Sequence, residues 1–117
     1  MHKLIITAHP STKGFTHTLA NNLRELSIAR GDTVEILDLY KTELKQDFLH
    51  FEDIRTYQEE AKNDPTTLVL QKKIQEADEL VFIFPVWWGD MPAIMKNFWD
   101  SNFLTGFAFK YENGKSV

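Results

Sequence analysis

The chain has 117 residues, 43% of them hydrophobic, and thirteen Lys and Arg against seventeen Asp and Glu give it a formal net charge of −4. This length fits a single domain over residues 1–117, and the acidic balance without a basic stretch argues against nucleic acid as a partner. The absence of cysteine excludes disulfides, a thiolate nucleophile and cysteine-ligated metals.

The first predicted elements are a strand over residues 3–8 and a loop, starting at His9, that leads into a helix. The loop and the helix start supply hydroxyl groups, the cation of Lys13, a flexible Gly14 and free N–H groups, all of which suit a phosphate. The loop matches neither G-x-x-x-x-G-K-[ST] nor G-x-G-x-x-G, which argues against nucleoside triphosphate hydrolysis and a standard dinucleotide fold. Taken alone, it is also ordinary helix-capping sequence.

The helix that follows is predicted to end near Arg30, with Gly31 in the C′ position. We expect it to pack on a sheet through an apolar stripe at helical spacing. The stripe consists of Phe15, Leu19, Leu23 and Leu26. A short β-branched segment over residues 33–39 predicts the second strand, so the chain begins with a strand-helix-strand unit.

Residues 40–64 are mostly polar and predict an irregular excursion that carries one short amphipathic helix. Phe48 and Phe51 lie in this excursion and are candidates for a contact with another subunit. Asp64 and Pro65 then form an N-cap and a first helical position, and the helix that they start leads to the third strand.

The most informative segment covers residues 79–100, beginning with the third strand. Its apolar run over residues 80–84 is typical of a strand covered on both faces in a parallel sheet, and Pro85 ends the pairing. Trp87 and Trp88 follow, past the carboxyl end of the strand, where open α/β sheets bind ligands. The flat rings of the two tryptophans suit a planar ligand. The alternative is that both tryptophans only cap the core, although adjacent side chains in extended backbone point to opposite sides.

The last helix is predicted to begin with Asp90 as N-cap and Pro92, and an aromatic stretch over residues 106–111 follows it. Right-handed crossovers then place three parallel strands in the order second, first, third, with helices on both faces. This is the first half of a flavodoxin-like, doubly wound parallel α/β sheet, in which strand order 2-1-3 is present and later strands are missing. The topology brings the two loops together. A phosphate-holding helix start beside tryptophans favours a flavin, FMN or FAD.

Several motifs along most of the chain recur in one known family. They are A-H-P over residues 8–10 with Phe15 seven positions after Ala8, D-L-Y over residues 38–40, F-P-x-x-W-x-x-x-P-A-I-x-K over residues 84–96, and Trp99-Asp100, Phe103 and G-F-A-F with Tyr111. Together they resemble the flavodoxin-fold NAD(P)H:quinone oxidoreductases, including ancillary oxidoreductases of bacterial potassium efflux systems. The resemblance implies hydride transfer from NAD(P)H through a bound flavin to a quinone or similar acceptor.

The resemblance also implies which residues hold the flavin. His9, Phe15 and Thr16 would lie against its phosphate and ribityl chain, and Pro85, Val86, Trp87 and Trp88 would line the ring. No catalytic side chain is assigned. Two alternatives stay open, namely His9 as a hydrogen-bonded loop residue that caps the helix, and Phe15 as a core residue.

The remaining expectations concern assembly and surroundings. The four histidines lack the spacing of metal ligands, and no apolar run approaches the roughly 20 residues of a membrane span. We therefore expect a cytoplasmic protein with no metal and no integral membrane segment. The family resemblance and the exposed aromatics predict a homodimer through the excursion or the last helix.

The third strand has no partner beyond it, so we expect the domain to be incomplete at its C-terminus, within a product of roughly 170 to 200 residues. Two alternatives to an active reductase stay open. One is a flavin-binding regulatory subunit with little turnover, and the other is a truncated non-catalytic product. A one-electron flavodoxin is less favoured, because the segment over residues 84–96 resembles the two-electron reductases more closely.

Overall fold

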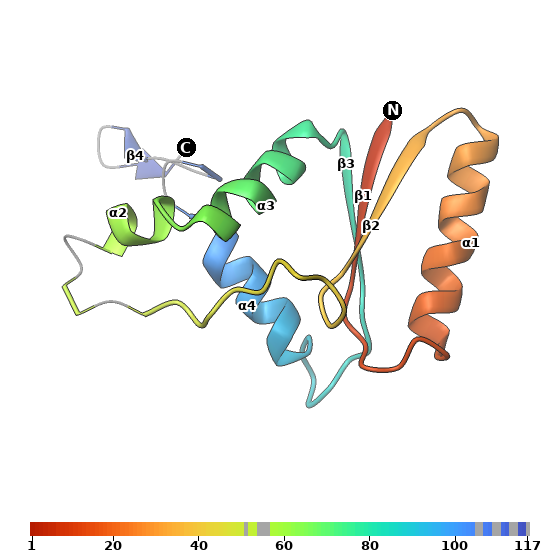
Figure 1. Cartoon of the computed structure of the whole chain (residues 1–117), viewed down its shortest axis with the longest axis horizontal. Coiled ribbons are helices and arrows are strands. Elements are labelled where there is room, and N and C mark those ends of the chain that lie inside the picture. Colours follow the sequence, from red (N-terminus) through yellow and green to blue (C-terminus); the bar gives the residue numbers. More distant parts are fainter. Residues whose placement is uncertain (51, 54–56, 105–106, 109–110, 113–114, 117) are drawn as a thin grey trace.

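The computed structural model describes residues 1–50, 52–53, 57–104, 107–108, 111–112 and 115–116. Its main feature is a three-stranded parallel sheet in the order β2-β1-β3 (Figure 1). The strands are β1 (His2–Thr7), β2 (Thr33–Asp38) and β3 (Glu79–Ile83). The predicted strand order and fold class are therefore confirmed.

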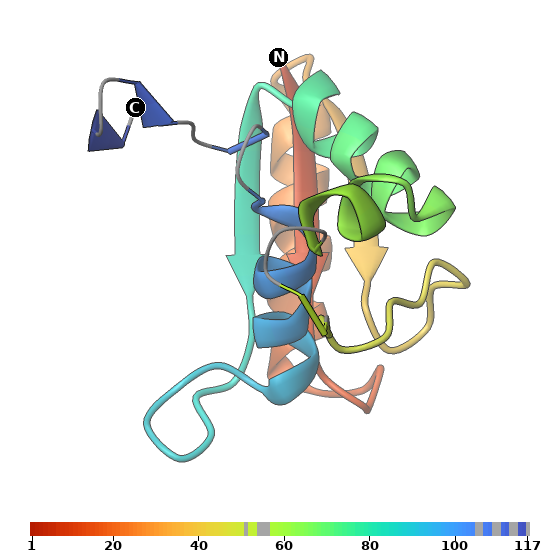
Figure 2. The same cartoon turned by 90° about the vertical axis from the view of Figure 1, so that its left-hand side faces the viewer.

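Helices cover both faces of this sheet, as Figures 1 and 2 show. One face is covered by α1 (Phe15–Ala29), and the other by α3 (Pro65–Glu76) and α4 (Ala93–Asn102). The short α2 (Tyr57–Lys62) packs beside α3. A separate antiparallel pair is formed by β4 (Tyr111–Glu112) and β5 (Lys115–Ser116).

The largest apolar core lies between the sheet and the α3–α4 layer. Alternate residues of β1 and the carboxyl end of β2 meet the inner faces of both helices there, as the alternation of side chains along a strand requires. The buried members are Leu4, Ile6, Ala8, Leu37, Leu39, Leu70, Ile74, Met95 and Phe98. None of the described helices is long and apolar enough to cross a membrane.

The apolar stripe of α1 does not pack on the sheet as predicted. Phe15 is 80% exposed and Leu19 and Leu26 are also exposed, so this prediction is wrong, as is the alternative that Phe15 is a core residue. The buried residues of α1 are Thr16, His17, Ala20 and Ser27. One of these small and polar residues, Ser27, bonds the buried Lys3 of β1.

Helix ends follow the sequence signals at two places and depart from them at a third. The helix α1 ends with Arg30 as C-cap and Gly31 at φ +95°, and Asp64 is the N-cap that precedes Pro65, both as predicted. In α4 the N-cap is Pro92 and not Asp90, because the Asp90 backbone is paired with Trp87 in a tight turn.

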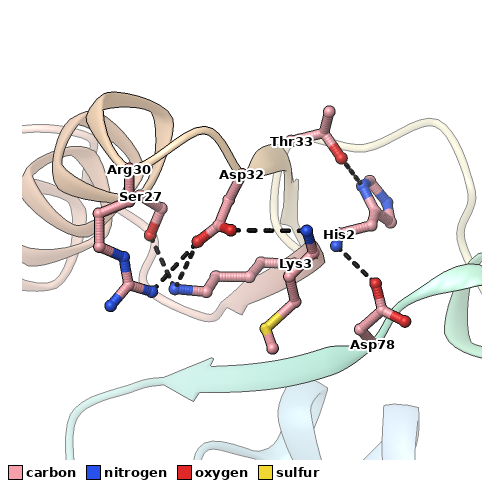
Figure 3. A network of polar contacts seen from close by, with 8 residues as sticks. His2, Lys3, Ser27, Arg30, Asp32, Thr33 and Asp78 are labelled. Atoms are coloured by element: carbon pink, nitrogen blue, oxygen red, sulfur yellow. Dashed lines mark hydrogen bonds and ion pairs between the residues drawn. The ribbon is translucent and has the colours of Figure 1, made fainter.

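The amino edge of the sheet carries a network of polar contacts, shown in Figure 3. Lys3 is buried, and its Nζ lies 3.0 Å from Ser27 Oγ and 3.3 Å from Asp32 Oδ2. Arg30 and the N-terminal amine also contact the Asp32 carboxylate, at 3.1 and 3.6 Å. We call Lys3, Ser27, Arg30 and Asp32 the amino-edge network.

The excursion after β2 is held against α3 and α4 mainly at Gln46, whose backbone carbonyl oxygen also accepts a bond from Asn97 of α4 at 3.0 Å. Gln46 exchanges two amide hydrogen bonds with Asn102, at 2.8 and 3.1 Å, and donates a third to Thr67 at 2.9 Å. Phe48 remains 72% exposed, while Phe51 lies outside the described residues. The excursion is therefore attached through partly buried polar contacts and presents an aromatic side chain to its surroundings.

Candidate functional site

The carboxyl ends of the three strands lie at one edge of the sheet, together with two loops that the sequence singled out. In Figures 1 and 2 the loop from β1 to α1 and the loop from β3 to α4 both lie at this edge. The first covers residues 8–14 and the second residues 84–92. Because parallel strands end at the same edge, segments about 75 residues apart in the chain become neighbours.

The orientation of His9 is set by hydrogen bonds within its own loop. The Ser11 N–H donates to His9 Nδ1 at 3.0 Å, and a backbone N–H can only donate. Nδ1 also lies 3.2 Å from the Ser11 carbonyl oxygen, which can only accept, so the two contacts require opposite tautomers of the ring. The ring also packs over Gly14, where an added Cβ would lie 3.5 Å from His9 Cε1. In the tautomer that accepts the Ser11 N–H, His9 presents an Nε2–H donor on the side away from Ser11.

The start of α1 has open hydrogen-bond donors. Its N-cap is Gly14, no side chain among the described residues accepts a bond from the first turn, and that turn contains no acidic residue. The first N–H groups of a helix lack partners within the helix and attract anions. Thr16 is buried on the inner side of this turn, and Phe15 is exposed beside it. The two residues predicted to hold a flavin phosphate and ribityl chain therefore lie at an uncapped helix start.

Residues 87–90 form a hairpin turn that places the second tryptophan at its tip. The Trp87 N–H donates to the Asp90 carbonyl at 2.8 Å, and the Asp90 N–H donates back to the Trp87 carbonyl at 3.1 Å. Trp88 and Gly89 have φ of +54° and +75°, as both central residues of a type I′ turn require. A left-handed conformation costs a residue other than glycine roughly 1–2 kcal/mol. Such a cost is often found at functional sites.

The two loops meet through His9 and Trp87. Their ring centroids lie 6.2 Å apart with 59° between the ring planes. Trp87 is 40% exposed and Trp88 is fully exposed, so the alternative that both tryptophans only cap the core is wrong. Val86 is exposed and Pro85 is half-buried. The structure therefore brings His9 and Trp87 together and leaves Trp88 projecting from the edge.

A third segment reaches the same edge through two residues that the sequence analysis did not place in the site. His17 is only 8% exposed, and its Nε2 lies 3.4 Å from the His9 carbonyl oxygen and 3.7 Å from Asp38 Oδ2. The other oxygen of Asp38 accepts the Tyr40 N–H at 3.0 Å. The sequence could have placed His17 and Asp38 in the site by topology alone, because the end of β2 and the first turn of α1 must both lie at the carboxyl edge.

Together, these features fit a nucleotide-like aromatic ligand. The start of α1, and His9 in the tautomer with its hydrogen on Nε2, are donors for a phosphate, and two exposed tryptophans provide flat apolar surfaces next to them. Within the part of the chain that the structure describes, no three His, Asp or Glu side chains are grouped to hold a metal ion. A flavin matches this set of groups better than a metal does.

Comparison with known proteins gives the same fold over the whole length. A family model described as flavodoxin-like fold matches residues 1–117. A Haemophilus influenzae protein named an uncharacterized NAD(P)H oxidoreductase is 35% identical over 123 residues, which cover 100% of this chain and 57% of that protein. An FMN-dependent NADH:quinone oxidoreductase of Clostridium beijerinckii is 40% identical over 90 residues, which cover 74% of this chain and 44% of that protein.

A solved structure shows the same likeness in three dimensions. The NAD(P)H:quinone oxidoreductase from Methanothermobacter marburgensis superposes with a TM-score of 0.82 and 33% identity. The superposition covers 95% of this chain and 57% of that one. The chain spans about half the length of the curated relatives that it matches.

Proposed function

The chain belongs to the flavodoxin-like fold family, and from this premise we propose that it binds FMN or FAD and serves hydride transfer from NAD(P)H to a quinone-like acceptor. The observation that carries the proposal is the meeting of His9 and Trp87 beside the uncapped start of α1. The proposal is supported by the similar proteins from Haemophilus, Clostridium and Methanothermobacter, which are all named as NADH or NAD(P)H oxidoreductases. We place the reaction in the cytoplasm, where NAD(P)H is available.

In this proposal the residues of the chain bind and orient the cofactor. The N–H groups of the first turn of α1 and the Nε2–H of His9 hold the phosphate, and Phe15 and Thr16 lie along the ribityl chain. Backbone groups over residues 85–88, with Trp87 and Trp88, line the ring and restrict water around it. A bound flavin supplies the hydride chemistry, so none of these side chains has to act as an acid or a base.

An anaerobic spectrum of the purified protein tests the proposal and separates its alternatives. We expect a yellow protein that loses its visible absorbance when NADH or NADPH is added under nitrogen and recovers it when a quinone follows. A yellow protein that neither nucleotide bleaches would favour the regulatory flavin-binding subunit. A colourless protein would contradict the proposal and favour the non-catalytic product. Chromatography of the released cofactor distinguishes FMN from FAD.

We also propose that the protein is a homodimer in which the excursion after β2 lies at the interface. Phe48 supports this, because it is exposed and lines a hollow of about 380 Å³ together with Tyr40 and Ile94. Exposed aromatics beside a hollow are common at subunit contacts. Light scattering at micromolar concentration should give the dimer mass for the wild type and the monomer mass for Phe48→Ser.

A matched control for the dimer experiment is Leu68→Ser, which removes an exposed apolar side chain from α3. This variant should remain a dimer. A monomeric wild type, or equal dissociation by both substitutions, would contradict the proposed interface.

A further inference from the structure

His17 joins three segments that end at the carboxyl edge of the sheet. It lies in the first turn of α1, and the two atoms facing its Nε2 are the His9 carbonyl oxygen and an Asp38 carboxylate oxygen. Both of these atoms can only accept hydrogen bonds, so the imidazole hydrogen that they share is on Nε2. One N–H group therefore connects the loop after β1 with α1 and with the end of β2.

Apart from a bond from Thr18 Oγ1 of α1 to the carbonyl oxygen of Gly14, the last residue of the loop, the other side-chain bonds of the loop among the described residues stay within it. Ser11 and Lys13 donate their backbone N–H groups to His9 Nδ1 and Ser11 Oγ, at 3.0 and 3.2 Å. Residues 10–13 are exposed. These local bonds shape the loop but do not fix its place relative to α1. The bond from His17 to the His9 carbonyl does, because it comes from the helix whose open N–H groups lie next to the loop.

Asp38 adds a second reason for a histidine at this position. Its carboxylate lies at the same edge as the open start of α1, and a carboxylate disfavours a nearby phosphate. The Tyr40 N–H donates to one oxygen, and Nε2 of His17 lies 3.7 Å from the other. These two donors offset part of the negative charge where an anion would otherwise be repelled.

We infer that His17 is a positioning residue for the phosphate end of the flavin. It holds the His9 backbone at a fixed place, so that the Nε2–H of His9 and the N–H groups of α1 converge on one anion. Donors that converge on one anion have to be held to within about 0.5 Å. The inference rests on the proposed flavin site. Beyond that site, the inference states that His17 affects the affinity for FMN, which has a phosphate, and not the affinity for riboflavin, which has none.

Titration of the purified protein with FMN and with riboflavin, followed by the quenching of flavin fluorescence, tests this inference. His17→Leu should weaken FMN binding at least about tenfold and change riboflavin binding by less than about twofold. His17→Gln, whose amide nitrogen reaches the place of Nε2, should keep most of the FMN affinity. His17→Asn, whose shorter amide does not reach it, should behave like His17→Leu.

The control is His2→Leu, which removes a histidine that bonds Thr33 at the opposite edge and should leave both affinities unchanged. If His17→Leu does not fold, the comparison of the Gln and Asn variants decides the question. Unchanged FMN binding in the Asn variant, or an equal loss for FMN and riboflavin, would overturn the inference. A wild type that binds neither ligand would overturn the proposed function and this inference with it.

Discussion

The two edges of the sheet use their polar groups in opposite ways. At the amino edge, Lys3, Ser27 and Asp32 are bonded to one another (Figure 3). At the carboxyl edge, the start of α1 has no capping side chain, and Trp88 occupies a left-handed conformation at an exposed tip. Groups bonded within the chain contribute to stability, whereas unpaired donors and an exposed ring remain available to a ligand. Stabilising contacts are therefore concentrated at the amino edge, and groups open to a ligand at the carboxyl edge.

The largest expected effect comes from Lys3→Ala at the amino edge. Only 5% of the Lys3 side chain is exposed, so the substitution leaves the Ser27 hydroxyl and the Asp32 carboxylate without a buried partner. The lost hydrogen bond to Ser27 and the cavity left by the aliphatic part of the side chain together cost about 3 kcal/mol, which a urea unfolding curve measures. The flavin dissociation constant should not change, because the network lies at the far edge.

Lys3→Met is the matched control, because methionine keeps the length of the side chain and removes the ammonium group with its hydrogen bonds. It should lose less stability than the alanine variant, about 1 kcal/mol, because it leaves no cavity. If Lys3→Ala weakened flavin binding in a protein that is still folded, the two edges would not be independent.

A medium effect is expected from Trp88→Gly at the carboxyl edge. Glycine adopts a φ of +54° without the cost that a tryptophan incurs, so the folded state should gain about 1 kcal/mol. Flavin binding should become weaker, because an aromatic stack contributes about 0.5–1.5 kcal/mol beyond buried area. Thermal unfolding and a flavin titration on the same sample measure both changes.

Trp88→Ala separates the two effects of the glycine variant. Alanine also lacks the ring but keeps the cost of a positive φ, so it should weaken binding without the gain in stability. An unchanged flavin dissociation constant in both variants would remove Trp88 from the proposed site.

A small effect on stability and a clear effect on binding are expected from Phe15→Ser. Phe15 is mostly exposed, so the free energy of unfolding should change by less than about 0.5 kcal/mol. Flavin affinity should fall, since Phe15 lies at the uncapped start of α1. Leu26→Ser on the same exposed stripe, near the other end of the helix, serves as the control and should leave binding unchanged. Equal affinities for the Phe15 and Leu26 variants would contradict the assignment.

The smallest effect concerns pH at the amino edge. Hydrogen bonds from Arg30 and then from Lys3 hold the pKa of Asp32 below its usual 3.8, while burial acts in the opposite direction. A carboxyl whose folded pKa is lowered adds stability above its usual pKa, and this contribution is lost as pH falls through the lowered value. The free energy of unfolding should therefore decrease between about pH 5 and pH 3 by more in the wild type than in Asp32→Asn. Parallel curves for the two proteins would exclude Asp32 as the cause.

Much of the fold could be predicted from local patterns in the sequence. The three apolar strand segments, the Gly31 helix end and the Asp64–Pro65 helix start are short-range signals, and the structure contains all of them. The right-handed crossover rule then gave the order β2-β1-β3 without any contact information. The family resemblance drawn from the motifs is confirmed by the family model. The assignment of individual residues to the flavin stays a prediction.

The sequence by itself determined which segments reach the carboxyl edge, because strand direction and order follow from periodicity and crossover handedness. Only the tertiary structure decided which side chains meet there. In α1, Ser27 faces Lys3 of β1, while Phe15 lies on the exposed side of the helix. The meeting of His17 with Asp38 depends on where β2 ends. Contacts of this kind join residues about 20 or more positions apart, and no local spacing encodes such distances.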